Sequence, residues 1–380
     1  MSGERKRVVH ISTVHSADDT RILFKEASSL AEAGYIVDLI APYKESVKIN
    51  NVRITAIPRS NTRLERITKS ATRALKIALQ KDADIYHFHD PELIPYAYYL
   101  KRVRRKKVIF DIHEDVPAQI MSKEWIPNLL KAPVRSMTFY TISHAIKTFD
   151  GVIFAEPIAL KKMNIAAQDK VIVVQNYPNI KEMEFIQSIS TEYANRPYKV
   201  AYLGGISTIR GANEMVDAIA EVDAKWNAKL VLGGKFTPAS LRDQLRRRRG
   251  WANVDYKGWL SREEVIEVLA QARAGLVTLH PEPNYIEAYP VKMFEYMAAG
   301  IPVIASDFPL WRQILHEIGA GILVDPLDPS SIASAIEWIF RNPEEAKAMG
   351  VRGQTAVREL YNWDNEKRKL LALYKEVLSK

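Results

Sequence analysis

The chain has 380 residues, of which 47% are hydrophobic and 26% are charged. At roughly 150 residues per domain, this length predicts two folded domains, and the composition excludes a disordered or collagen-like chain. The chain contains no cysteine, which excludes disulfides, thiolate metal sites and a cysteine nucleophile and favours a cytoplasmic protein. No apolar run approaches the ~18 residues of a membrane span, so any membrane contact is expected to be peripheral.

The excess positive charge lies in the first half of the chain. Residues 1–180 carry 28 basic and 19 acidic side chains, residues 181–380 carry 26 of each, and the net charge is +9. The basic segments lack a reading helix or interleaved aromatic residues, so we expect no nucleic-acid partner. Segment 63–81 has an amphipathic pattern that suits either a solvent-exposed helix or a helix on a membrane surface, and we favour contact with anionic lipid at the inner face of the cell membrane.

Short β-branched runs alternate with longer helical patterns, which predicts parallel strands joined by helices. The expected strands of the first half are 7–13, 36–41, 52–57, 85–88, 108–112, 151–154 and 171–174. Those of the second half are 199–203, 229–232, 254–256, 275–279, 302–305 and 321–324. Each half is therefore predicted to be an α/β, doubly wound, Rossmann-like domain.

A polar stretch at 181–197 separates the two series of strands, so we expect domains at 1–180 and 198–360. Segment 361–380 repeats apolar residues at helical spacing, and we expect it to pack back on the first domain. Because ligands bind at the carboxyl ends of parallel strands, we expect the active site in a cleft between two facing domains.

The strongest motif is the segment 287–306. It runs from Glu287 through Pro290 into a helix that contains Glu295, and Gly300-Ile301-Pro302 ends that helix before a strand. Free N–H groups at the helix start favour a phosphate. Ionised carboxylates accept hydrogen bonds from vicinal hydroxyl groups.

Two glutamates eight positions apart, followed by Gly-x-Pro-Val, resemble the retaining nucleotide-sugar glycosyltransferases of family 4, the glycosyl transferases group 1. This resemblance implies the GT-B fold. It also implies transfer of a sugar from a UDP- or GDP-linked donor to a glycan or lipid-linked acceptor, in cell-surface polysaccharide or glycolipid synthesis. By position, Glu287 would contact the donor sugar and Glu295 the ribose.

A second match to the family covers residues 201–211, where a strand runs into a Gly-rich loop and then a helix. The family usually has Arg at the position of Gly205 and Lys at that of Arg210, both of which bind the donor diphosphate. One cation is therefore missing, and we expect Lys292 to replace it. With Lys292 included, the expected donor-binding residues are Gly204, Gly205, Arg210, Gly258, Trp259, Leu260, Tyr289, Pro290, Val291, Lys292 and Glu295.

Trp259 suits either packing on the nucleobase or a place in the core. Just after it, Ser261 and Glu264 have the spacing of a capping box, which predicts the start of a helix.

Histidines follow several strand ends of the first half. The family often has a histidine beyond the strand at 108–112 that contacts the donor sugar, so the resemblance implies that His113 and Glu287 are the catalytic residues. Candidate acceptor-side residues are His15, His89, Asp90 and Glu114.

Asp82-Ala83-Asp84 resembles the Asp-x-Asp metal motif of another glycosyltransferase architecture, but it precedes a strand, so we expect solvated surface there. We therefore expect no metal and no other cofactor, with positive side chains stabilising the leaving diphosphate. The family's mechanism implies attack on the same face of the sugar. Two alternatives stay open: a nucleotide-sugar epimerase of the same architecture, and a catalytically silent, membrane-associated partner subunit.

Overall fold

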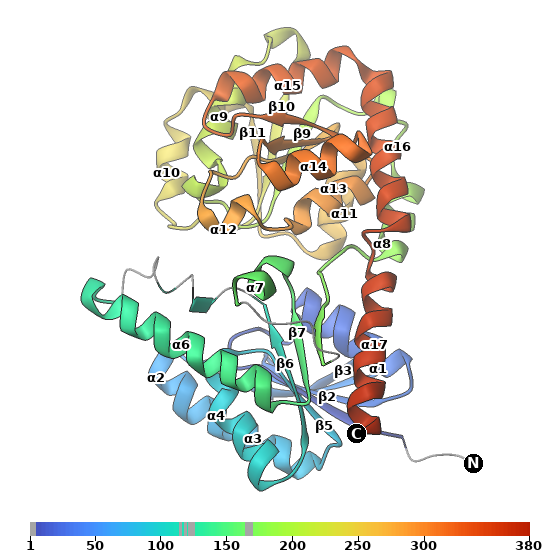
Figure 1. Cartoon of the computed structure of the whole chain (residues 1–380). Coiled ribbons are helices and arrows are strands. Elements are labelled where there is room, and N and C mark those ends of the chain that lie inside the picture. The colour runs from blue at the N-terminus through green and yellow to red at the C-terminus, as the bar shows by residue number, and fades with distance from the viewer. Residues whose placement is uncertain (1–4, 114–115, 118–119, 121–125, 164–169) are drawn as a thin grey trace. The chain divides into compact units, whose positions relative to one another are not determined.

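The computed structural model describes residues 5–380 except 114–115, 118–119, 121–125 and 164–169 (Figure 1). The chain forms two compact units, the first made of Met1–Asn176 and Asn365–Lys380 and the second of Tyr177–Asp364. Each unit is built around one sheet with helices on both of its faces. Among the described helices, none combines the length and the apolar sequence that crossing a bilayer requires.

The first unit contains an eight-stranded sheet with the order β3-β4-β2-β1-β5-β6-β7-β8. Neighbouring strands are parallel, except that β3 and β4 form an antiparallel hairpin. The strands are β1 (Arg7–Ile11), β2 (Ile36–Pro42), β3 (Val47–Ile49), β4 (Val52–Ile57), β5 (Ile85–Phe88), β6 (Lys107–Ile112), β7 (Gly151–Phe154) and β8 (Val171–Val173).

The helical segments of the first unit connect these strands. They are η1 (Thr20–Ala27), α1 (Ser28–Glu32), α2 (Arg63–Glu65), η2 (Arg66–Ser70), α3 (Ala71–Lys81), η3 (Pro91–Leu93), α4 (Ile94–Tyr98), η4 (Tyr99–Val103), α6 (Asn128–Thr148), α7 (Pro157–Lys162) and α17 (Trp363–Ser379). From Asn365 onward, α17 belongs to the first unit although it ends the chain.

Every strand expected from the sequence is present, with ends that differ by at most two residues. Strand β3 was not expected, because its three residues are largely exposed and lack a buried face. It joins β4 through Asn50 and Asn51, which have positive φ values of 47° and 63°. This is the conformation of a two-residue type I′ hairpin turn, so an Asn-Asn pair between two β-branched runs is the signal that predicts it.

The central strands of the first sheet have one apolar and one polar face. Side chains alternate along a strand, so Phe88 and Phe110 lie on one face, in a core shared with α3, α4 and α6. His10, His87 and Asp111 lie on the other face and are fully buried. Parallel strands are normally apolar on both faces. The buried polar side chains on this face are therefore unusual, and they are candidates for a functional site.

The second unit contains a six-stranded parallel sheet with the order β11-β10-β9-β12-β13-β14. Its strands are β9 (Lys199–Leu203), β10 (Lys229–Gly233), β11 (Val254–Gly258), β12 (Ala274–Val277), β13 (Val303–Ser306) and β14 (Gly321–Val324). Alternate residues of β9 enter two separate apolar clusters, one on each face of the sheet. This is the doubly wound arrangement that the sequence predicts.

The helices of the second unit cover both of those faces. They are α8 (Ile180–Ile189), η5 (Tyr193–Asn195), η6 (Thr208–Arg210), α9 (Ala212–Glu221), η7 (Ala224–Trp226), α10 (Leu241–Arg246), η8 (Arg249–Asn253), α11 (Arg262–Gln271), α12 (Pro283–Ile286), α13 (Val291–Ala298), α14 (Pro309–Ile318), α15 (Pro329–Arg341) and α16 (Pro343–Glu359).

The two units divide at Tyr177, ahead of the polar stretch 181–197 where the sequence suggests the boundary. The reason is helix α8, which covers much of that stretch. Its Met183 and Ile186 are buried in the core of the second unit, so this segment is part of a domain and does not act as a linker.

Candidate active site

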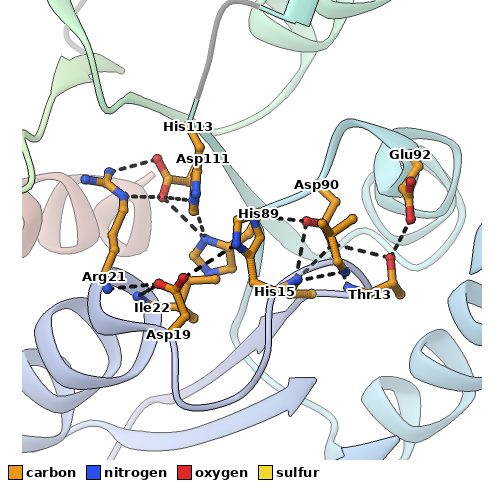
Figure 2. Close-up of polar contacts among 12 residues, drawn as sticks. Thr13, His15, Asp19, Arg21, Ile22, His89, Asp90, Glu92, Asp111 and His113 are labelled. Carbon is orange, nitrogen blue, oxygen red and sulfur yellow. Dashed lines mark hydrogen bonds and ion pairs between the residues drawn. The ribbon is translucent and has the colours of Figure 1, made fainter. Parts of the chain in front are cut away.

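The carboxyl ends of β1, β5 and β6 bring polar side chains together at one edge of the first sheet (Figure 2). Four of the residues predicted from the sequence meet there: His15, His89, Asp90 and His113. The fifth first-half candidate, Glu114, lies outside the described residues.

Asp111 is the centre of this group. His113 Nε2 lies 2.8 Å from its Oδ2, and Arg21 donates two hydrogen bonds to it, 3.0 Å from Nε and 2.9 Å from a terminal nitrogen. Burial alone would raise the pKa of the Asp111 carboxyl, but the charges of Arg21 and His113 outweigh burial and hold that pKa well below its usual range. An ionised Asp111 therefore holds the His113 ring in place through Nε2.

His15 stands beside His113, with the two ring centroids 4.8 Å apart. Its Nδ1 lies 3.5 Å from Asp19 Oδ2 and its Nε2 lies 3.8 Å from Asp90 Oδ1. Burial alone would lower the pKa of His15, but the hydrogen bond to Asp19 and the nearby carboxylates raise that pKa. Since 30% of the side chain is exposed, His15 can offer a positive charge to a ligand that arrives from solvent.

Asp90 organises the loop that follows β1. The Thr13 backbone N–H and the Ser12 hydroxyl both donate to its Oδ2, at 2.6 and 3.1 Å. Glu92 accepts a hydrogen bond of 2.8 Å from the Thr13 hydroxyl and two more from Arg66, at 2.6 and 2.9 Å. Because the Asp90 carboxylate is buried and bound to the chain, its role is to hold this loop in place.

Three residues missed by sequence reasoning lie below this edge: His10, His87 and Tyr374. The Tyr374 hydroxyl is 2.7 Å from His87 Nδ1 and 3.5 Å from His10 Nε2, and His10 Nδ1 is 2.9 Å from His89 Nε2. The sequence does hold a signal for the histidines, since His87 and His89 are two positions apart and thus share a face. Tyr374 lies too far along the chain for any local pattern to place it there.

These buried histidines are neutral. Burial, and next the neighbouring His89, lowers the pKa of His10 and of His87 well below the usual value. Burial also lowers the pKa of His89, although the hydrogen bond to Asp111 opposes the shift. The polar face of the sheet therefore holds neutral imidazoles beneath the charged Asp111.

The Asp-x-Asp segment lies at the start of β5, at the opposite edge of the sheet from these histidines. Asp82 is largely exposed and pairs with Lys106 at 2.7 Å, and Asp84 pairs with Lys6 at 3.0 Å. Each carboxylate thus has its own lysine partner near the solvent.

In the second unit, two cations converge on the Gly204–Gly205 loop. A Cβ atom on Gly204 would lie 2.5 Å from Lys292 Cε, and one on Gly205 would lie 3.3 Å from a terminal nitrogen of Arg210. Lys292 Nζ is 5.4 Å from the centre of the Tyr202 ring. The chain therefore brings Arg210 and Lys292 together where the sequence lacks the usual Arg.

The surroundings of Lys292 change the pKa of its side chain. Burial, and next the charge of Arg210, lowers the pKa of Lys292 to about 8. Two positive groups held close together in a partly buried loop form a site for an anion with at least two negative charges.

Glu295, on α13, is fixed by Arg262 from the start of α11. Arg262 donates to Glu295 Oε1 at 2.7 Å and to the two oxygens of Glu182 at 3.0 and 2.7 Å. The capping box predicted for Ser261 and Glu264 is confirmed, and it begins the helix at Arg262. Arg262 is a further residue missed by sequence reasoning, because its partners lie 33 and 80 positions away.

Glu287, Tyr289, Pro290 and Val291 form the connection between α12 and α13. Glu287 is exposed and follows directly after α12, and Pro290 immediately precedes the first residue of α13, Val291. Trp311 Nε1 donates a hydrogen bond of 2.8 Å to the Ala288 carbonyl and so anchors this connection from α14.

Gly258, Trp259 and Leu260 follow β11. Gly258 has a φ of +72°, which suits a residue without a side chain. Trp259 is 70% exposed, so a place in the core, one of its two interpretations, is wrong. Lys235 Nζ lies 4.9 Å from the centre of the Trp259 ring. Because most of the indole is still exposed, it offers a surface to a ligand.

Two family models match the chain, and together they span most of it. The model described as Glycosyltransferase Family 4 matches residues 20–176, and the model described as Glycosyl transferases group 1 matches residues 183–356. The chain belongs to the family 4 glycosyltransferases. The family predicted from the motif at Glu287 and Glu295 is thus confirmed, and neither the epimerase nor the silent subunit is favoured.

Relatives of this glycosyltransferase match it over nearly its whole length. It is 21% identical to the phosphatidyl-myo-inositol mannosyltransferase of Mycobacterium leprae, over 92% of this chain and 91% of that protein. Sucrose-phosphate synthase from Thermosynechococcus elongatus has a similar structure, with a TM-score of 0.76 and 19% identity over 99% of this chain and 100% of that one. HepE from Anabaena, in complex with UDP-glucose, has a TM-score of 0.70 and 12% identity, over 97% and 99%. The GT-B fold class is confirmed.

Proposed function

We propose that this glycosyltransferase moves a sugar, with retention of its anomeric configuration, from a UDP- or GDP-linked donor to a glycan or lipid-linked acceptor, in cell-surface polysaccharide or glycolipid synthesis. The observation that carries the proposal is the pair of cations, Arg210 and Lys292, at the Gly204–Gly205 loop. Burial, and next the charge of Arg210, lowers the pKa of Lys292, and a bound diphosphate would offset both effects with its negative charge. HepE, whose structure is similar, is in complex with UDP-glucose, and this supports a donor of the same class.

The contacts to the ribose, the sugar and the base of the donor are assigned from the chemistry of the side chains and from their positions in the family motifs. Glu295 is assigned to the ribose hydroxyls, because it is an acceptor held in place by Arg262 at 2.7 Å. Glu287 is assigned to the donor sugar, and the exposed indole of Trp259 to the nucleobase.

The proposed transfer needs no metal ion at the diphosphate. The bond between the sugar C1 and the phosphate oxygen breaks, and the acceptor oxygen forms its bond to C1 on the same face. The leaving phosphate takes the acceptor's proton. Arg210 and Lys292 stabilise the negative charge that develops on the diphosphate. His113, oriented by Asp111 at 2.8 Å, is assigned to holding the sugar.

We place the protein in the cytoplasm and propose peripheral contact with anionic membrane. The segment Arg63–Lys81 buries Ala71, Ala74 and Ala78 and presents Lys69, Arg73 and Lys76 along a surface groove. A basic helical surface attracts acidic headgroups. The mycobacterial relative is named for a phosphatidyl lipid, which supports a lipid-linked acceptor here.

Calorimetric titration with UDP, GDP and their sugar conjugates tests the donor proposal. One nucleotide is expected to bind selectively, and Arg210→Ala to weaken it about tenfold or more, the scale of a lost charged hydrogen bond. Arg341→Ala is the matched control, because Arg341 ends α15 and pairs with Glu337. If no nucleotide binds, or if Arg210→Ala binds it as well as the native chain, the donor site is wrong.

Two further measurements test retention and membrane contact. NMR of the product gives its anomeric configuration, which shows whether the configuration of the donor is retained. Sedimentation with phosphatidylcholine vesicles, with and without phosphatidylglycerol, decides membrane contact, and Lys69→Glu together with Arg73→Glu is expected to reduce binding to the anionic vesicles.

A further inference from the structure

A cluster of metal-binding side chains lies inside the first unit, on the polar face of its sheet. His10 on β1 is the register partner of His87 on β5, and His89 follows two positions later. Glu26 reaches the same cluster from η1. All four side chains are buried, and one donor atom from each lies within 4.8 Å of the others.

The hydrogen bonding of this cluster is incomplete. Neither carboxylate oxygen of Glu26 accepts a hydrogen bond, and His87 Nε2 has no hydrogen-bond partner either. Arg21 Nε lies 3.0 Å from Glu26 Oε1, but its proton points to Asp111. One guanidinium thus serves two buried carboxylates, so Glu26 needs either a proton or a further cation. Without an ion, burial and next the charge of Asp111 raise the pKa of the Glu26 carboxyl well above its usual value, and a bound cation would take the place of that proton.

The outer nitrogens of the three histidines are already held. His87 Nδ1 lies 2.7 Å from the Tyr374 hydroxyl, His89 Nδ1 lies 3.3 Å from Asp111 Oδ2, and His10 Nε2 lies 3.5 Å from the same hydroxyl. Metal-binding histidines usually have such a partner on the nitrogen that faces away from the ion. Of the nitrogens that could face an ion, His87 Nε2 has no hydrogen-bond partner, whereas His10 Nδ1 and His89 Nε2 share a hydrogen bond of 2.9 Å that the ion would replace.

The spacing of the rings also suits an ion. Imidazole nitrogens bind zinc at 2.0–2.1 Å in a tetrahedral arrangement, which puts the ring centroids about 5 Å apart. The observed centroid separations are 4.5 Å for His10 and His87, 4.5 Å for His87 and His89, and 5.2 Å for His10 and His89.

We propose that His10, Glu26, His87 and His89 bind one divalent transition metal ion, with zinc as the best fit to three imidazoles and one carboxylate. Four protein ligands close the coordination shell, so the ion has a structural role and is separate from the donor diphosphate. Through His89, which contacts both Asp111 and His113, it would set the position of the predicted catalytic histidine.

Metal analysis of the full-length chain without an affinity tag tests this proposal. After removal of bound metal with a chelator, re-addition of zinc and dialysis, we expect about one zinc per chain and a thermal unfolding midpoint that rises with zinc concentration. Glu26→Gln and His87→Gln are expected to lose the ion. His144→Gln is the matched control, because His144 stacks on Tyr98 away from the cluster.

Tyr374→Phe keeps all four ligands and removes only the hydroxyl that holds two of the rings. It is expected to weaken zinc binding by about 10- to 100-fold in competition with a chromophoric chelator. Native chain that retains no zinc, and whose unfolding midpoint does not respond to zinc, would overturn the proposal. So would equal zinc content in the native chain, Glu26→Gln and His87→Gln.

Discussion

Among single residues, Lys292 has a charge that depends on pH near neutrality. Burial and the neighbouring Arg210 lower its pKa to about 8, so the ammonium is present below that pH and is lost above it. We therefore expect affinity for the nucleoside diphosphate to fall between about pH 7 and about pH 9, because the neutral amine attracts phosphate weakly. Calorimetric titration across this range measures the effect.

Lys292→Arg is the control for this prediction. An arginine keeps its charge throughout the range, so the affinity of that variant should stay constant. A native chain whose affinity is equally constant would show that Lys292 does not contact the diphosphate.

The contributions of Glu295 and Arg262 to donor affinity can be measured by single substitutions. Glu295→Ala is expected to weaken donor binding by about 1–3 kcal/mol, the scale of lost charged hydrogen bonds. Arg262→Ala should act in the same direction, because Glu295 then loses its 2.7 Å partner. Glu184→Ala is the control, since Glu184 lies at an exposed position of α8, and it should leave donor binding unchanged. Unchanged affinity in Glu295→Ala would defeat the ribose assignment.

At the scale of elements, Asp19 has two separable roles at the start of η1. Its Oδ1 accepts hydrogen bonds from the Arg21 and Ile22 backbone N–H groups, at 2.9 and 3.0 Å, while Oδ2 faces His15 at 3.5 Å. Asp19→Ala is expected to lower the free energy of unfolding by about 1 kcal/mol, the usual cost of a lost helix cap. Denaturant titration measures this change.

Asp19→Asn separates the cap from the charge. Asparagine caps a helix as well as aspartate does, so stability should be nearly unchanged. The pKa of His15 should fall, because the hydrogen bond to the Asp19 carboxylate helps to raise it, and NMR titration of the ring reads that pKa. A His15 pKa that is the same in Asp19→Asn would mean that other carboxylates control it.

At the scale of the whole molecule, the last helix completes the first unit. Leu373 on α17 is buried, and its side chain lies 3.3 Å from the position of a Cβ on Gly151. Leu373→Ala is expected to destabilise the protein by about 2–5 kcal/mol, whereas Lys375→Ala, at an exposed position of the same helix, should change little. Hydrogen exchange should speed up in β5 and β7 but not in β9 or β12. Faster exchange in β9 and β12 as well would show that the two units unfold together.

Much of the fold and part of the site follow from local sequence patterns. Short β-branched runs between helical patterns predicted every strand except β3, and the Ser261–Glu264 spacing predicted the start of α11, because these signals depend on neighbours within a few residues. The family motifs also predicted Arg210 and Glu295 as donor-binding residues, and the cation missing at Gly205 led to the prediction of Lys292 as its replacement.

The sequence by itself therefore determined the two doubly wound units and the family, and it predicted the residues that are assigned to the proposed donor site. Only the tertiary structure decided which buried polar groups meet. Tyr374 and His87 are 287 positions apart, and Glu295 and Arg262 are 33 apart. The physical reason is that such contacts depend on strand order and on the docking of the last helix, which local periodicity does not encode.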